Sequence, residues 1–135
     1  MVIRYLQLDD VLRQVGRLGF VVGDAGLLAG ALARPQATVF GEDAYQTVWT
    51  KAAALCQSID NSQSLVDGNK RLSWLVTKVF LAINDQSLQA ATDEGERFMV
   101  ELVAGHAPLD TIASWLREHS QESPGPDLQV DELST

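Results

Sequence analysis

The spacing of apolar residues is helical along almost the whole chain. The clearest stripe follows the i, i+3, i+4, i+7 pattern of one helix face, through Leu8, Val11, Leu12, Val15 and Leu18. No segment shows the sustained apolar–polar alternation of a strand, apart from a short extended piece at residues 2–6. The sequence therefore predicts an all-α fold, a compact bundle of about six helices.

Turn and cap residues set the expected helix boundaries. Gly19 is a C-cap for the first helix, and Asp24 caps a second helix that Pro35 ends. Residues 35–41 are expected to form a loop with Val39 and Phe40 tucked inward. The other helices are expected to start near Glu42 and Asp43, at Leu72, at Thr92 and at Pro108.

The segment from Leu72 to Asn84 is apolar almost all round, which predicts that this helix is the central one. Cys56 lies in the apolar stripe of the preceding helix, so a buried core thiol is expected. Of the tryptophans, Trp49 and Trp74 are expected in the core more than Trp115. A single cysteine excludes an internal disulfide and any multi-cysteine metal site.

Length and charge limit the classes of protein to consider. The chain has 135 residues, enough for one domain, and a net charge of −8 from 10 Lys and Arg against 18 Asp and Glu. Such an acidic surface is a poor binder of nucleic acid. No signal peptide or membrane-spanning stretch is apparent, so we infer a cytoplasmic protein. We expect a folded domain over residues 1–119 and a disordered acidic tail over 120–135.

The segment that carries chemistry runs from Asp67 to Arg71, directly before the apolar helix. First-turn N–H groups lack intrahelical partners and favour anions, and Gly68 allows close approach to the backbone. Lys70 and Arg71 add positive charge, and Asp67 is an oxygen ligand suited to Mg²⁺ on phosphates. A bland alternative, a polar helix cap without a ligand, fits the same Asn, Asp and Gly residues.

Residues 63–71, Gln-Ser-Leu-Val-Asp-Gly-Asn-Lys-Arg, resemble the Fic/Doc signature, His-x-Phe-x-Asp/Glu-Gly-Asn-Lys/Gly-Arg. The residues Asp24-x-Gly-Leu-Leu, Arg34-Pro35 and Phe40-Gly41 also look like Doc (death-on-curing) toxins, and the likeness covers residues 4–118. The resemblance implies that Asp67 binds Mg²⁺ and that Gly68 and Asn69 form the anion hole. It implies that Lys70 and Arg71 hold the phosphates of ATP.

The family's catalytic histidine, the general base, aligns with Gln63, which cannot titrate near neutral pH. Loss of a general base typically costs about 10²–10⁴-fold in rate. The change is an inactivating substitution, natural decay, or a case in which another residue supplies the base. His106 and His119 lie far along the chain and are expected to be surface or capping residues.

The Doc branch is favoured because Trp74 stands where AMP-transferring Fic enzymes usually carry a second arginine. The resemblance then implies a toxin kinase that phosphorylates a threonine of elongation factor Tu, blocks translation and is neutralised by a Phd-type antitoxin. Two alternatives stay open: AMP transfer, or a catalytically dead module that binds an antitoxin or a translation factor. A plain structural helical domain would bind no Mg–ATP.

Overall fold

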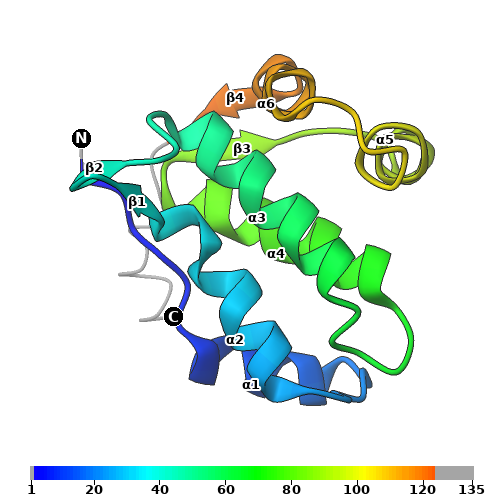
Figure 1. The fold of residues 1–135 in the computed structure, drawn as a ribbon. Helices are drawn as coiled ribbons and strands as arrows, with labels where there is room; N and C mark the ends of the chain where they lie inside the picture. Colours follow the sequence, from blue (N-terminus) through cyan, green and yellow to red (C-terminus); the bar gives the residue numbers. More distant parts are fainter. Residues whose placement is uncertain (1, 124–135) are drawn as a thin grey trace, which may run out of the picture.

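A computed structural model describes residues 2–123 of the chain (Figure 1). Six α-helices dominate this part of the chain, which confirms the predicted all-α class. They are α1 (Leu8–Arg17), α2 (Ala25–Ala33), α3 (Val48–Ser62), α4 (Asn69–Ile83), α5 (Thr92–Phe98) and α6 (Leu109–Glu118). A 3-10 turn, η1 (Arg34–Gln36), extends α2, and a π-helical segment, η2 (Met99–Val103), extends α5.

Two small antiparallel strand pairs complete the described fold. β1 (Thr38–Val39) pairs with β2 (Glu42–Asp43) in a hairpin between α2 and α3. β3 (Gln86–Leu88) pairs with β4 (Ser120–Glu122), with Leu88 opposite Ser120. The second pair joins the end of α4 to the end of α6. No helix of the described chain has the length and apolar character needed to cross a membrane.

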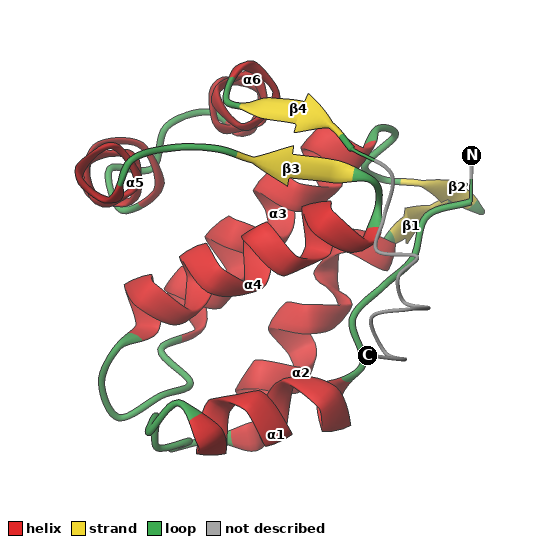
Figure 2. Cartoon of the chain, turned by 180° about the vertical axis from the view of Figure 1, so that it is seen from behind, coloured by secondary structure: helices red, strands yellow, loops and turns green. Residues whose placement is uncertain are grey.

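Helices α3 and α4 lie side by side in the middle of the molecule, with α1 and α2 on one side and α5 and α6 on the other (Figure 2). The central helix is α3, whereas the sequence pointed to residues 72–84. α3 packs against α2, η1, α4 and α6, and Ala52, Ala53 and Ala54 are all fully buried. These small side chains let neighbours approach from several directions. α4 instead leaves Lys78 and Val79 exposed.

The expected start of α3 was wrong. Glu42 and Asp43 lie in β2, and α3 begins only at Val48, after Thr47. The Thr47 side chain accepts a hydrogen bond from the Thr50 N–H at 3.1 Å, and the Thr50 hydroxyl accepts one from the Thr47 N–H at 3.1 Å. This reciprocal cap satisfies two otherwise unpaired donors, which the acidic pair upstream cannot do from a strand.

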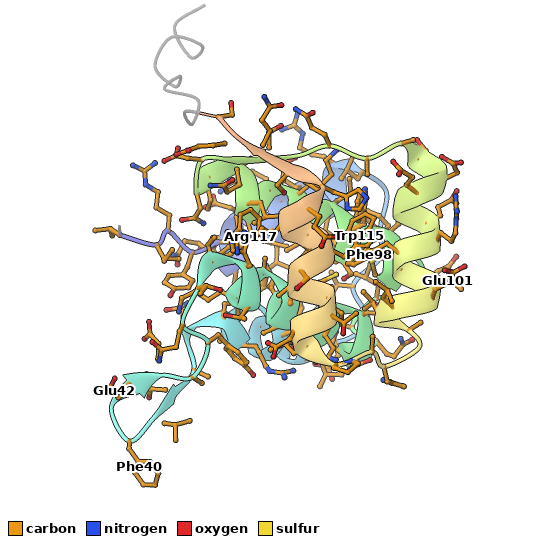
Figure 3. All side chains as sticks on the ribbon, turned by 90° about the horizontal axis from the view of Figure 1, so that it is seen from above. Phe40, Glu42, Phe98, Glu101, Trp115 and Arg117 are labelled. Carbon is orange, nitrogen blue, oxygen red and sulfur yellow. The ribbon has the colours of Figure 1, made fainter. Side chains whose placement is uncertain are left out.

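The expectation that Val39 and Phe40 point inward was also wrong. Both are exposed, and Figure 3 shows Phe40 at the tip of the hairpin, away from the helices. Phe40 has φ +52° and Gly41 has φ +81°. Two successive left-handed residues reverse the chain within the hairpin and leave the Phe40 side chain in solvent.

The folded part extends beyond the predicted boundary at residue 119. Residues 120–122 form β4, and the Ser123 N–H donates to the Asp85 carbonyl at 2.9 Å. The tail was predicted from composition, which cannot detect that residues 86–88 provide a pairing edge. The predicted disorder of the rest of the tail falls on residues 124–135, outside the described residues.

Candidate functional site

The loop between α3 and α4, residues 63–68, is fastened to the segment between α1 and α2. The Val66 N–H donates to the Val21 carbonyl at 2.9 Å, and the Ser64 carbonyl accepts from the N–H groups of Gly23 and Asp24 at 2.8 and 3.0 Å. Figure 2 shows the two loops next to each other at one end of the bundle. The loop therefore has a fixed backbone from which the start of α4 projects.

Asn69 closes this loop with its side chain. Its Oδ1 accepts a hydrogen bond from the Leu65 N–H at 2.9 Å, and its Nδ2 donates to the Leu65 carbonyl at 3.2 Å. The Asn69 carboxamide is thus occupied with holding the backbone. Gly68 and Asn69 were expected to form an anion hole. Because the Asn69 side chain is already hydrogen-bonded to Leu65, its backbone N–H is the group that remains available to an anion.

Gly68 occupies the N-cap position of α4 with φ +88°, and no side chain caps this helix. A Cβ at Gly68 would lie 2.6 Å from the Phe20 ring, so the close contact with Phe20 requires glycine. The Gly68 N–H is held by Asp67 Oδ1 at 2.9 Å. The first-turn N–H groups of α4 therefore face outward with no capping group in front of them, which suits an anion.

Two cations lie at this helix start. Lys70 and Arg71 are exposed in the first turn of α4, and the Arg71 guanidinium lies 5.1 Å from the centre of the Phe20 ring. A groove of about 440 Å³ runs from these two residues past Trp74 and Lys78 toward α5 and η2. In a chain of net charge −8, this is a local cationic site at a helix N-terminus.

Gln63 lies at the C-cap of α3 with φ +51°, at the beginning of the same loop. Its Nε2 donates to the Asp60 carbonyl at 2.8 Å, and its Oε1 accepts from Asn69 Nδ2 at 3.4 Å. The side chain therefore reaches the side chain of Asn69, six residues along. An amide at this position can position a polar group but cannot accept its proton.

The surroundings of Asp67 bear on its expected role as a ligand of Mg²⁺. Within residues 2–123 no group of three or more His, Cys, Asp or Glu could hold a metal ion. Asp67 is exposed, and only its Oδ1 is engaged. Mg²⁺ commonly uses one or two carboxylates together with water and substrate phosphates, so Asp67 fits an ion delivered with a nucleotide.

The other titratable candidates lie away from this loop. His119 is the C-cap of α6, stacks on Trp115 at 3.7 Å between ring centres, and its Nδ1 lies 2.8 Å from the Trp115 carbonyl. His106 is exposed after η2. Burial raises the pKa of the Cys56 thiol to about 11, against hydrogen bonds from Ser73 and Thr77 that lower it, which keeps Cys56 an inert core residue.

Two residues of the site were missed from sequence. Phe20 packs on Gly68, 48 positions away in the chain, and no local pattern signals such a contact. Asp60 is buried beside the loop, with its Oδ1 4.0 Å from Lys70 Nζ. A signal for Asp60 existed, since it continues the buried stripe of Cys56 at i+4 on α3.

Trp74, predicted in the core, is half-buried and joins an aromatic cluster. Its ring centre lies 5.8 Å from Phe98 and 6.1 Å from Trp115, and Phe98 stacks on Trp115 at 4.1 Å. Figure 3 shows Phe98 and Trp115 next to each other. The cluster packs α4 against α5 and α6. Trp74 thus fills, with an apolar ring, the position one turn after Arg71.

Comparison with known proteins found a matching family model and a curated relative. The Fic/DOC family model matches residues 4–81, which includes the whole loop and most of α4. A curated protein of Mycolicibacterium smegmatis named Toxin Doc is 47% identical over 118 residues, covering 83% of this chain and 90% of that protein. No solved structure matches the chain. Because the family model matches more than half of the chain and the identity to Toxin Doc extends over most of it, the chain belongs to the Fic/DOC family.

Proposed function

We propose that the protein is the toxin component of a toxin–antitoxin module, with an ATP- and Mg²⁺-dependent kinase site directed at elongation factor Tu. The carrying observation is the uncapped N-terminus of α4, where Gly68 leaves the backbone open and Lys70 and Arg71 flank it. The likeness to a protein named Toxin Doc supports the toxin role. A Phd-type antitoxin is the expected partner, and the cytoplasm is the expected compartment.

In this proposal each residue of the loop has one task. The N–H groups of the first turn of α4 bind phosphate oxygens, and Lys70 and Arg71 neutralise their charge. The free oxygen of Asp67 holds the magnesium ion. When bound, Mg–ATP supplies the phosphoryl group for transfer. Asn69 keeps the loop closed through Leu65, so that these groups stay in one arrangement.

The proposal includes a weakened activity, because Gln63 stands where the family has its histidine. Phosphoryl transfer depends mostly on positioning and charge neutralisation, so the remaining residues keep part of the catalysis. A histidine at residue 63 could donate one ring N–H to the Asp60 carbonyl, as Gln63 Nε2 does now, and leave the other nitrogen as a base. The positive φ at residue 63 suits the change from glutamine to histidine, since histidine tolerates positive φ better than most residues.

Transfer of the γ-phosphate is favoured over transfer of AMP. AMP-transferring relatives usually hold phosphates with a second arginine at the position of Trp74. Here that position lies against Gly95 and Phe98, and it offers no charge to a phosphate. A catalytically silent module that only binds its partners is the second candidate, and Gln63 is the observation that favours it.

A paired transfer assay tests the proposal. The chain and its Gln63→His variant are incubated with elongation factor Tu, Mg²⁺ and ATP labelled on either the γ- or the α-phosphate. Gln57→His, on the same helix but outside the loop, is the matched control. We expect γ-label transfer to rise about 10²–10⁴-fold for Gln63→His and not for Gln57→His.

Other outcomes decide between the alternatives. Transfer of the α-label identifies an AMP-transferase and contradicts the kinase assignment. If neither the chain nor Gln63→His transfers either label, while antitoxin or elongation factor still binds, the protein is the silent module. Loss of the γ-label signal when Asp67→Asn is added to Gln63→His supports the metal role of Asp67.

A further inference from the structure

Asp60 combines burial with an unmet hydrogen-bonding requirement. It lies in the last turn of α3, and 4% of its surface is exposed. Its Oδ1 is the only buried side-chain nitrogen or oxygen within residues 2–123 that has no hydrogen-bond partner. Such burial of a carboxylate oxygen is costly, so stability alone does not account for an aspartate here.

The cation closest to this oxygen belongs to the candidate phosphate site. Lys70 Nζ lies 4.0 Å from Asp60 Oδ1, and the Lys70 side chain is 51% exposed. Lys70 is in the first turn of α4, where the helix dipole disfavours a positive charge. The Asp60 charge offsets this effect and attracts the ammonium group toward the end of α3.

The backbones of the two residues are fixed without this ion pair. Asn69 holds the loop through Leu65, and Gln63 holds the end of α3 through the Asp60 carbonyl rather than its carboxylate. The movable part is thus the Lys70 side chain, a flexible four-carbon stem whose ordering has an entropic cost. A fixed negative charge beside it restricts where its ammonium group can be.

We propose that Asp60 is a positioning residue, which keeps the Lys70 ammonium beside the open N-terminus of α4 and ready for a phosphate. The inference rests on the proposed function, since it assumes that a nucleotide phosphate binds there. Asp60 does not touch the ligand in this account. It acts by ordering Lys70 before the ligand arrives, which lowers the entropic cost of binding.

Charge repulsion makes the opposite prediction, and this allows a clear test. A carboxylate near bound phosphates repels them, so its removal through repulsion alone would tighten binding. Removal of a positioning group instead weakens binding. The repulsion would also act whether or not Lys70 is present, whereas positioning acts only through Lys70.

The binding experiment is a double-mutant cycle on the affinity for Mg–ATP, measured by calorimetry with the full chain. Its members are wild type, Asp60→Asn, Lys70→Ala and the double variant, with Glu101→Gln on η2 as a charge-matched control. We expect Asp60→Asn to weaken binding by roughly three- to tenfold, and to have no effect once Lys70 is alanine. Tighter binding, or the same change in both backgrounds, overturns the proposal.

A second measurement needs no nucleotide and no variant to begin with. NMR relaxation of the lysine side-chain methylene groups compares Lys70 with Lys78, which lies on the same helix and has no ion pair within residues 2–123. We expect Lys70 to be the more ordered in wild type and to become as mobile as Lys78 in Asp60→Asn. Equal mobility in wild type overturns the proposal.

The two measurements separate this inference from the proposed function. If wild type binds no Mg–ATP although Asp60 orders Lys70, the proposed function fails. The inference that Lys70 is ordered for a nucleotide phosphate then fails with it. If wild type binds Mg–ATP but Lys70 is not ordered by Asp60, only the inference fails.

Discussion

Gly68 is the residue on which the geometry of the candidate site depends most directly. Its left-handed backbone begins α4, and its missing side chain lets Phe20 pack against the loop. Asn69 adds a second restraint through Leu65. The sequence showed the glycine and the asparagine as part of a motif, and physical reasoning alone left a polar cap as an alternative. It could not show which neighbours hold them, because Phe20 and Val21 are distant in the chain.

Gly68→Ala is expected to destabilise the protein by about 2–4 kcal/mol, from left-handed backbone strain together with the clash against Phe20. Gly41→Ala is the control, because Gly41 also has positive φ but nothing lies within 4 Å of a Cβ there. That variant is expected to lose only about 1 kcal/mol. Urea denaturation measures both. Equal losses of unfolding free energy would show that the Phe20 contact has no effect. If the contact matters, Phe20→Leu should recover part of the stability lost in Gly68→Ala.

Cys56 predicts a pH dependence of stability. Its pKa is raised from 9.0 to about 11 by burial, so the folded state retains the thiol proton more tightly than the unfolded chain. The stabilisation is fully present below pH 9 and is lost as the pH rises toward 11, by about 2–3 kcal/mol. Lys51, whose pKa is also raised, acts in the same direction at higher pH, because its contacts with Tyr5 and Asp43 outweigh its burial.

The measurement is the free energy of unfolding at pH 8, 9, 10 and 11 for wild type and Cys56→Ala. The variant retains Lys51, so the difference between the two curves isolates the thiol. We expect the two curves to converge as the pH rises. Parallel curves would contradict a buried, protonated thiol.

At the scale of elements, the boundaries of the helices follow their caps. Asp24 starts α2 as expected, and its side chain accepts a hydrogen bond from the Leu27 N–H at 3.0 Å. α3 starts later than expected, because the Thr47–Thr50 cap determines its first residue. The sequence contained both possible starts, and the acidic pair at residues 42–43 matched the helix-dipole pattern. The hairpin that occupies those residues depends on a pairing between β1 and β2 that apolar spacing does not reveal.

Thr47→Ala is expected to lower the free energy of unfolding by about 1 kcal/mol, since it leaves first-turn N–H groups of α3 without a cap. Thr111→Ala, exposed in the first turn of α6, is the matched control and should change stability by less than about 0.5 kcal/mol. Thermal and denaturant unfolding of the two variants give the comparison. A loss no larger for Thr47→Ala than for Thr111→Ala would show that the cap does not stabilise α3.

At the scale of the whole molecule, the all-α class and the order of the helices were predictable, because helical periodicity is a local property. The identity of the central helix was not. Apolar content favoured residues 72–84, whereas packing places α3 in the middle through its run of alanines. The end of the domain was not predictable either, because β4 is polar and is ordered by pairing with β3 rather than by burial.

The role of β4 gives a prediction about truncation. A chain that ends at His119 loses the backbone pairing of residues 120–122 with β3. We expect it to be about 2 kcal/mol less stable than a chain that ends at Ser123, which retains the pairing. Thermal denaturation compares the two. Equal stability would mean that the domain ends at residue 119, as the sequence suggested.

The central claim is that the N-terminus of α4 binds the phosphates of a nucleotide. The most direct measurement is a backbone amide NMR titration of the full chain with Mg–ATP. We expect the largest shifts at residues 68–71, with α2 as an internal comparison, because Asp24 already caps that helix. Shifts confined to residues 68–71 and their neighbours would support the claim. No shifts, or shifts centred elsewhere, would contradict it.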